Sequence, residues 1–162
     1  MKQKIFILFL TIPMCILFGQ KEILKEDIFL NWTFTQDRVY GFNSMNDGIH
    51  YTTIERGDTI SIEKHNYKSG ETVNVLLKST DINIDFRDYK FNSDETLLLL
   101  ETDSEQIYRY SKKGIYYLYN IQTNEIYKIS DKKIRLAEFS PNSKYISYVY
   151  QNNIYTYNIK NQ

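Results

Sequence analysis

The chain has 162 residues and carries 20 basic and 20 acidic side chains, so its formal net charge is zero. This balance provides no electrostatic attraction for nucleic acid or for an anionic membrane surface. The hydrophobic share of 42% is enough for one ordinary core. Fifteen tyrosines, nine phenylalanines and a single alanine, Ala137, favour strands over helices. We therefore expect an all-β fold.

The N-terminal segment has the features of an export signal. Lys2 and Lys4 precede an apolar run at residues 5–18, which is followed by Gly19 and Gln20. A basic start, a short apolar run and a small residue near its end are typical of a signal peptide. The run is shorter than the roughly 20 apolar residues of a membrane-spanning helix, so we prefer cleavage to an uncleaved anchor. We predict a signal peptide at residues 1–20 and an exported protein that is periplasmic, cell-surface or secreted.

The only cysteine, Cys15, lies within this segment. Acylation, as in a lipoprotein, is the alternative to an ordinary apolar role, but residues 12–14 lack the small side chains that usually precede an acylated cysteine. Removal of the segment would leave no cysteine for a disulfide or a thiolate nucleophile.

After this segment, residues 21–38 form a lead-in with one predicted helix at residues 21–29. Short apolar or aromatic runs separated by polar turns follow and predict strands, at residues 50–53, 60–67, 72–77, 97–100, 116–121, 126–129, 145–150 and 154–159. The polar residues 101–114 between two of these strands are more than a hairpin loop requires. Polar excursions from a rigid scaffold often carry binding groups, so this segment is a candidate site.

A weak repeat organises the strands. The motif Phe-Asn-Ser-Asp-Glu at residues 91–95 recurs as Phe-Ser-Pro-Asn-Ser at residues 139–143, and a fainter copy begins at Met45. A period in the forties with short strands is typical of a β-propeller, which usually has about four or more blades. We therefore expect a partial β-propeller at residues 39–162, with blades near 39–80, 81–130 and 131–162. This would be the first part of a larger protein.

No catalytic or metal-binding pattern is visible in the sequence. No serine has glycines at both flanking positions of a hydrolase elbow, and neither zinc-ligand spacing nor a Gly-rich phosphate loop is present. His50 and His65 fall in predicted strands, where we interpret them as sheet-surface residues rather than bases or ligands. We expect no catalytic residue, cofactor, metal or nucleic-acid partner for this chain.

Three segments resemble one family: residues 44–52, residues 89–119 with the motif Glu-Gln-Ile-Tyr-Arg-Tyr-Ser at 105–111, and residues 139–149. They are similar to the propeller of secreted dipeptidyl peptidase IV-like serine peptidases, of the prolyl oligopeptidase family, over about residues 27–162. The resemblance implies about two and a half to three blades of an eight-bladed propeller, with an α/β-hydrolase domain downstream. It also implies removal of Xaa-Pro or Xaa-Ala dipeptides from peptide N-termini by a Ser-Asp-His triad. Neither that triad nor the family's substrate-binding glutamate pair is in the chain, so we do not expect activity from it alone.

The resemblance implies a substrate-binding role for Arg109. In the family, the matching arginine reaches from the propeller into the active-site cavity and donates hydrogen bonds to a backbone carbonyl of the substrate. A guanidinium suits this role because it is always charged and offers several fixed donors. The residues by themselves favour an exposed arginine or an ion pair to Asp103 or Glu105, and the match of the loop to the family reverses that preference. Tyr110 stands where family members often have histidine, so the surroundings of Arg109 differ.

Two functions are compatible with these features. The first is the N-terminal propeller fragment of a secreted dipeptidyl peptidase IV-like serine exopeptidase, in which the propeller gates and binds the substrate. Its partners would be a peptide substrate and the downstream α/β-hydrolase domain. The resemblance is also compatible with a homodimer of the full-length protein. The second is a non-enzymatic extracytoplasmic β-propeller that serves as a binding or scaffold module. A downstream hydrolase elbow would distinguish the first from the second.

Overall fold

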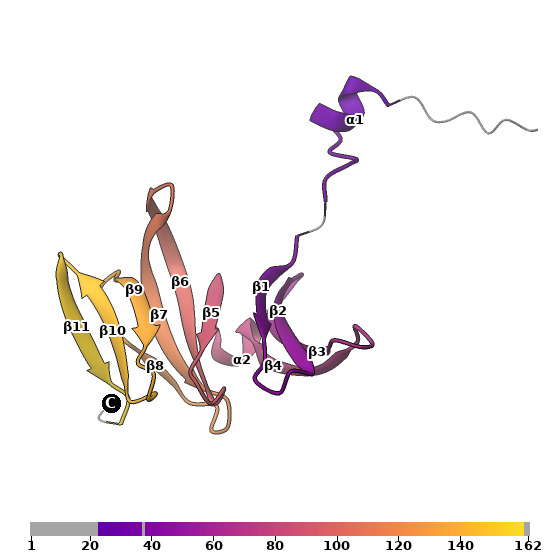
Figure 1. Cartoon of the computed structure of the whole chain (residues 1–162). Coiled ribbons are helices and arrows are strands. Elements are labelled where there is room, and N and C mark those ends of the chain that lie inside the picture. The colour runs from indigo at the N-terminus through magenta and orange to yellow at the C-terminus, as the bar shows by residue number, and fades with distance from the viewer. Residues whose placement is uncertain (1–22, 37, 161–162) are drawn as a thin grey trace, which may run out of the picture. The chain divides into compact units, whose positions relative to one another are not determined.

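The computed structural model describes residues 23–36 and 38–160, and the chain divides into two units at residues 37 and 38. The first unit contains helix α1 (Lys25–Phe29), where the sequence predicts a helix at residues 21–29 (Figure 1). Its first turn is closed by the Asp27 carboxylate, which accepts a hydrogen bond of 3.2 Å from the Leu24 N–H. The predicted signal peptide lies outside the described residues. Neither helix in the described part of the chain is long and apolar enough to cross a membrane.

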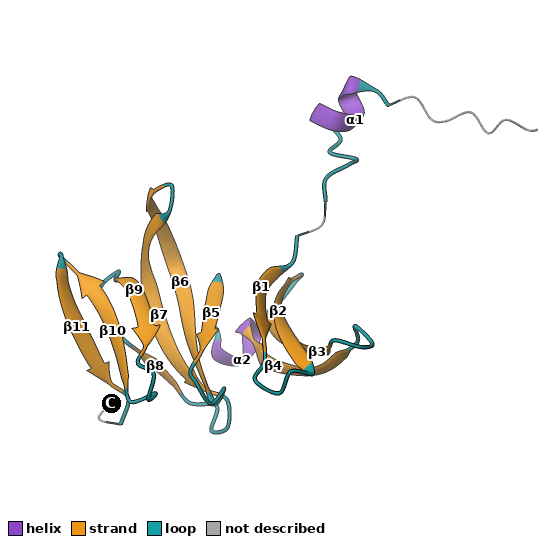
Figure 2. Ribbon diagram, in the orientation of Figure 1, coloured by secondary structure: helices purple, strands orange, loops and turns teal. Residues whose placement is uncertain are grey.

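The second unit contains eleven strands among its described residues, arranged in three antiparallel sheets (Figures 1 and 2). The first sheet comprises β1 (Tyr40–Ser44), β2 (His50–Arg56), β3 (Ile60–Asn66) and β4 (Thr72–Lys78). The second comprises β5 (Asp88–Phe91), β6 (Leu97–Tyr108), β7 (Ser111–Asn120) and β8 (Ile126–Lys128). The third comprises β9 (Arg135–Phe139), β10 (Tyr145–Tyr150) and β11 (Asn153–Asn158). The short helix α2 (Ser79–Ile82) joins the first sheet to the second.

The strands of each sheet pair in chain order, so each sheet is a meander. Successive antiparallel meanders are the arrangement of propeller blades. The all-β, partial-propeller fold predicted from the sequence is therefore confirmed. Strands β1, β5 and β9, together with α2, were not predicted individually, because each is short and lacks a continuous apolar run.

Two apolar cores hold the three sheets together. The first core contains Ile54 and Ile62 of the first sheet with Leu98 and Leu100 of the second. The second core contains Leu99 of the second sheet with Ile146 of the third. Since successive side chains of a strand point to opposite faces, Leu98 and Leu100 reach one core while Leu99 reaches the other. The continuous apolar run at residues 97–100 thus reflects a strand that is buried on both faces.

Equivalent turns of the three sheets are linked to one another. The backbone N–H of Asn46 donates to Glu95 Oε1 at 2.7 Å, and its Nδ2 donates to the carbonyl oxygen of Ser93 at 2.9 Å. One repeat later, the N–H of Ser93 donates to Ser143 Oγ at 3.4 Å, and its hydroxyl donates to the carbonyl oxygen of Pro141 at 3.1 Å. The same pair of hydrogen bonds therefore links sheets one and two and links sheets two and three.

Candidate functional site

The most prominent feature of the second sheet is the extension of β6 and β7 beyond their neighbours, which we call the arm and define as residues 103–114 (Figure 1). The polar excursion expected at residues 101–114 is therefore mostly two paired strands rather than a loop. Tyr108 pairs with Ser111, which leaves Arg109 and Tyr110 as the two residues of the tip. Arg109 therefore lies at the end of the second sheet that is farthest from the apolar cores.

The guanidinium of Arg109 is exposed and lies 5.4 Å from the centre of the Tyr110 ring, within cation–π range. Tyr110 is 87% exposed and Tyr108 is 76% exposed, so the tip carries two aromatic side chains beside the cation. The carboxylates considered as partners for Arg109 are engaged elsewhere, since Asp103 pairs with Lys133 and Glu105 with Lys113. Arg109 is thus presented to solvent as a donor.

The backbone of the tip is held by Gln106. Its side-chain amide donates to the carbonyl oxygens of Tyr108 and Arg109, the second at 3.1 Å. A register shift between Gln106 and Tyr108 accompanies these bonds. One side chain therefore fixes the turn from which Arg109 projects.

The root of the arm is a bulge that requires glycine on the opposite strand. The β6–β7 register shifts between Thr102 and Glu105, and Asp103 has a positive φ of 42°. A Cβ at Gly114 would lie 2.9 Å from the backbone oxygen of Thr102. Gly114 also exchanges two backbone hydrogen bonds of 2.9 Å with Ile134, just before β9. This close approach ties the base of the arm to the third sheet.

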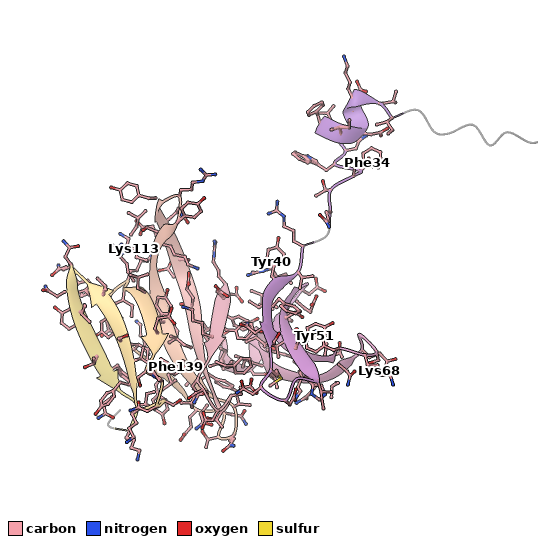
Figure 3. The ribbon with its side chains drawn as sticks, viewed as in Figure 1. Phe34, Tyr40, Tyr51, Lys68, Lys113 and Phe139 are labelled. Atoms are coloured by element: carbon pink, nitrogen blue, oxygen red, sulfur yellow. The ribbon has the colours of Figure 1, made fainter. Side chains whose placement is uncertain are left out.

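Ion pairs line one side of the arm. Lys113, labelled in Figure 3, lies 3.0 Å from Glu105, and Lys133 reaches Asp103 at 3.1 Å and Glu105 at 3.6 Å. The hydrogen bond from Lys113 lowers the pKa of Glu105, and the hydrogen bond to Asp103 raises the pKa of Lys133. The two carboxylates are exposed and the two lysines half-buried, so salt screens their attraction, and the pairs orient the arm only weakly.

A buried carboxylate lies on the other side of the root. Glu101 is only 5% exposed, and its oxygens accept hydrogen bonds from the hydroxyls of Ser104 and Tyr116, the latter at 3.1 Å. Lys112 Nζ lies 2.7 Å from Glu101 Oε2 and 3.8 Å from Asp88 Oδ2. Burial, together with the nearby Glu101 carboxylate, raises the pKa of the Tyr116 phenol.

A cavity of about 160 Å³ opens beside this cluster. Its lining includes Glu101 and Tyr116 next to the root, and Lys112 and Tyr110 from the outer part of the arm. The lining offers charges of both signs and hydroxyl groups, so it can bind polar groups. Glu101, Lys112, Tyr116 and Gln106 were not predicted as site residues from the sequence. The available signal was that Glu101 directly continues the buried run at residues 97–100, which leaves a charge at a position where burial is expected.

The two histidines lie in strands of the first sheet, as predicted, and outside the arm. His50 Nδ1 lies 2.7 Å from Asp47 Oδ2, and this hydrogen bond is the main cause of a lowered pKa at Asp47. His65 lies between the hydroxyls of Thr53 and Thr72, at 2.8 and 3.3 Å, and stacks on a tyrosine. Within residues 23–36 and 38–160, no group of three or more His, Cys, Asp or Glu side chains is arranged to hold a metal ion.

Comparison with known proteins shows that the chain, with its arm, is similar to one family. The family model described as "Dipeptidyl peptidase IV (DPP IV) N-terminal region" matches residues 92–162, which include the arm. The crystal structure of dipeptidyl peptidase 4 from Porphyromonas gingivalis superposes with a TM-score of 0.72 at 30% sequence identity, covering 88% of this chain and 21% of that one. The chain corresponds to the N-terminal propeller region of dipeptidyl peptidase IV-like peptidases.

Curated relatives of this dipeptidyl peptidase IV-like region are much longer than the chain. Prolyl endopeptidase FAP of Mus musculus is 30% identical over 138 residues, covering 84% of this chain and 18% of the relative. Inactive dipeptidyl peptidase 10 of Rattus norvegicus is 26% identical over 107 residues, covering 63% of this chain and 13% of the relative. The chain therefore spans less than a fifth of the length of either relative. The resemblance predicted from the sequence is confirmed.

Proposed function

We propose that the chain is the substrate-facing propeller region of an exported dipeptidyl peptidase IV-like serine exopeptidase. The parent protein would remove Xaa-Pro or Xaa-Ala dipeptides from peptide N-termini, with its Ser-Asp-His triad on an α/β-hydrolase domain. The observation that carries the proposal is the exposed guanidinium of Arg109, at the tip of an arm whose turn is fixed by Gln106.

The proposed chemistry of Arg109 is hydrogen bonding to a backbone carbonyl of the substrate. A guanidinium keeps its charge at any working pH and directs several N–H donors in a fixed plane. Hydrogen bonds from charged donors are shorter and stronger than neutral ones, and they gain strength where water is excluded. Arg109 would position the peptide for attack by the triad and would not itself take part in bond cleavage.

The test is release of dipeptide by the protein that joins this chain to its hydrolase domain, measured on a Gly-Pro or Ala-Pro substrate. Arg109→Ala is compared with Lys113→Gln, which removes a positive charge from the same arm away from the tip. A fall in kcat/KM for Arg109→Ala alone supports the proposal. Equal kinetics for both variants and the parent would contradict it.

Export of the protein is a separate proposal, supported by the basic and apolar pattern of residues 1–20. N-terminal sequencing of the exported product should find a start at Gln20 or Lys21. Recovery of the chain from the cytosol with Met1 intact would argue against export.

The second candidate function is a non-enzymatic propeller that acts as a binding or scaffold module. It is favoured by the similarity to a relative that is itself named an inactive dipeptidyl peptidase. The parent protein would then release no dipeptide from any substrate tested. Arg109→Ala would nevertheless weaken the binding of a peptide to the parent protein. The same pair of variants in a binding assay therefore separates the two functions.

A further inference from the structure

We propose that Glu101 is a positioning residue, whose buried carboxylate clamps the root of the arm and so determines where the Arg109 guanidinium stands. The structural half of this proposal concerns the arm alone. Its consequence for substrate binding rests on the proposed function above.

The location of Glu101 suits a clamp. It pairs with Asp88 of β5 on one side and with Tyr116 of β7 on the other, so it lies in the last row where the second sheet is three strands wide. The run before it, residues 97–100, belongs to the two apolar cores, whereas the bulge at Asp103 follows two residues later. Glu101 therefore lies at the boundary between the packed sheet and the arm.

The contacts of Glu101 join both strands of the arm. Ser104, whose hydroxyl donates to Oε1, belongs to β6 and lies within the bulge. Lys112 and Tyr116, which contact Oε2 at 2.7 and 3.1 Å, belong to β7. A buried carboxylate is stable only when such partners replace the water it has lost. Tyr116 pairs with Glu101 inside the packed sheet, whereas Ser104 and Lys112 belong to the arm. Rotation of the arm at the bulge would separate Ser104 and Lys112 from the carboxylate, so these two contacts oppose that rotation.

Two backbone hydrogen bonds also tie Gly114, at the end of the arm, to Ile134, but the contacts between Asp103 and Lys113 fix the angle of the arm less firmly. The arm itself has few buried side chains, and its ion pairs through Glu105 and Asp103 are exposed. Six residue steps at about 3.3 Å each put Arg109 at most roughly 20 Å from the bulge at Asp103, so a tilt of about 10° would move it by up to roughly 3 Å. A misplacement of about 1 Å can lower a rate roughly a hundredfold. The contacts that hold the root therefore determine the position of the Arg109 guanidinium.

The simpler role for Glu101 is general stabilisation of the second sheet. Hydrogen exchange of the full chain separates this role from the clamp. We compare Glu101→Gln with Glu63→Gln, a matched change at a half-buried carboxylate of the first sheet, which accepts hydrogen bonds from Ser61 and Thr72 at 2.9 and 3.1 Å.

With a clamp, amide exchange in residues 103–113 should accelerate roughly 5- to 30-fold in Glu101→Gln, as expected for the loss of about one or two kcal/mol of local stability. Amide exchange in β10 and β2 should not change in Glu101→Gln. Amide exchange in the arm should not change in Glu63→Gln. Unchanged exchange in the arm of Glu101→Gln, or equal acceleration of exchange in all three sheets, would contradict the proposal that Glu101 clamps the arm. If Glu101→Gln does not fold, Lys112→Met removes one partner that is 43% exposed, and it should accelerate exchange in the arm alone.

The functional half is tested by a double-mutant cycle of Glu101→Gln and Arg109→Ala in the protein that joins the chain to its hydrolase domain. If Glu101 acts through Arg109, Glu101→Gln lowers kcat/KM by itself but adds little once Arg109 is alanine. Additive losses would show that Glu101 acts independently of Arg109 and would refute the positioning role. If Arg109→Ala has no effect, the proposed function fails, whereas the exchange experiment still decides whether Glu101 holds the arm.

Discussion

Asn46 and Ser93 hold the same position in successive turns, and each donates one backbone and one side-chain hydrogen bond to the turn that follows. Pro141 holds that position in the third turn. Since proline has neither a backbone N–H nor a side-chain donor, it cannot repeat the pair. The fourth position of each turn supplies the side-chain acceptor, Glu95 or Ser143, but in the first turn this residue is Gly48. Within the described residues, the repeated contact therefore links the turn of Asn46 to that of Ser93, and the turn of Ser93 to that of Pro141.

Asn46→Ala should separate the first two sheets slightly and lower the free energy of unfolding by about 0.5–1.5 kcal/mol, the usual net value of one hydrogen bond. The alanine retains the backbone N–H, so only the bond to the Ser93 carbonyl is lost. Urea denaturation of the full chain measures the change, with Lys68→Ala in an exposed turn of the first sheet as the control. Equal stability of the two variants would show that the turn contact contributes nothing.

Gly114→Ala should be among the most damaging single changes in the second sheet. Its Cβ would meet the Thr102 backbone oxygen at 2.9 Å, and backbone cannot move aside as a flexible side chain does. We expect a loss of about 1–3 kcal/mol, the usual result of overpacking, visible as a lower urea midpoint. Gly57→Ala is the matched control, because a Cβ there has nothing within 4 Å. A Gly114→Ala midpoint equal to that of Gly57→Ala would contradict the close approach.

Arg109→Ala should lower kcat/KM of the peptidase about 10- to 150-fold, because a hydrogen bond from a charged donor contributes roughly 1.5–3 kcal/mol. Arg109→Lys should restore activity only partly, since lysine offers a point charge without the planar set of donors. Thermal melting of the same variants should be nearly unchanged, as the residue is exposed. A collapsed melt would instead make Arg109 a structural residue.

Acid should weaken the first sheet through Asp47. The hydrogen bond from His50 holds the pKa of the Asp47 carboxyl below its ordinary value, so the carboxylate stabilises the fold above the unfolded pKa of about 4. That contribution is lost as the pH falls below about 4 toward the folded pKa. The urea midpoint of Asp47→Asn should therefore depend less on pH between about 5 and 2 than that of the parent chain. The control is Asp58→Asn, at an exposed position, which should retain the pH dependence of the parent chain. If Asp47→Asn shows the same pH dependence as Asp58→Asn, Asp47 does not contribute to acid sensitivity through His50.

Strand β11 should promote self-association of the chain. It pairs with β10 on one side only among the described residues, and Ile154 on it is 78% exposed. Open edges with apolar side chains add further strands, and a charge on the edge opposes this. Ile154→Lys should therefore lower the weight-average mass measured by sedimentation, whereas Ile49→Lys, in an exposed turn, should not. A parent chain that is monomeric at all concentrations would remove the basis of this prediction.

Much of the fold could be predicted from residues that are close in the sequence. The aromatic and apolar runs at residues 145–150 and 154–159 form β10 and β11 almost residue for residue, because such side chains suit a pleated, half-buried surface. The recurrence of the turn at residues 91–95 and 139–143 predicted repeated sheets. Three segments, among them the motif around Arg109, predicted the resemblance to dipeptidyl peptidase IV-like peptidases that the comparisons confirm.

The amino-acid sequence by itself determined eight of the eleven described strands, their grouping into repeated sheets and the presence of Arg109 on a segment between two of them. Only the tertiary structure decided that the polar residues 103–114 are paired strands, because their partners lie across the hairpin and local propensity does not favour a strand there. It also decided that Glu101 is buried, since burial of a charge depends on Lys112, Tyr116 and Ser104 arriving together. Contacts between residues far apart in the chain, such as Ser93 with Ser143, arise only after the cores have packed the sheets against one another.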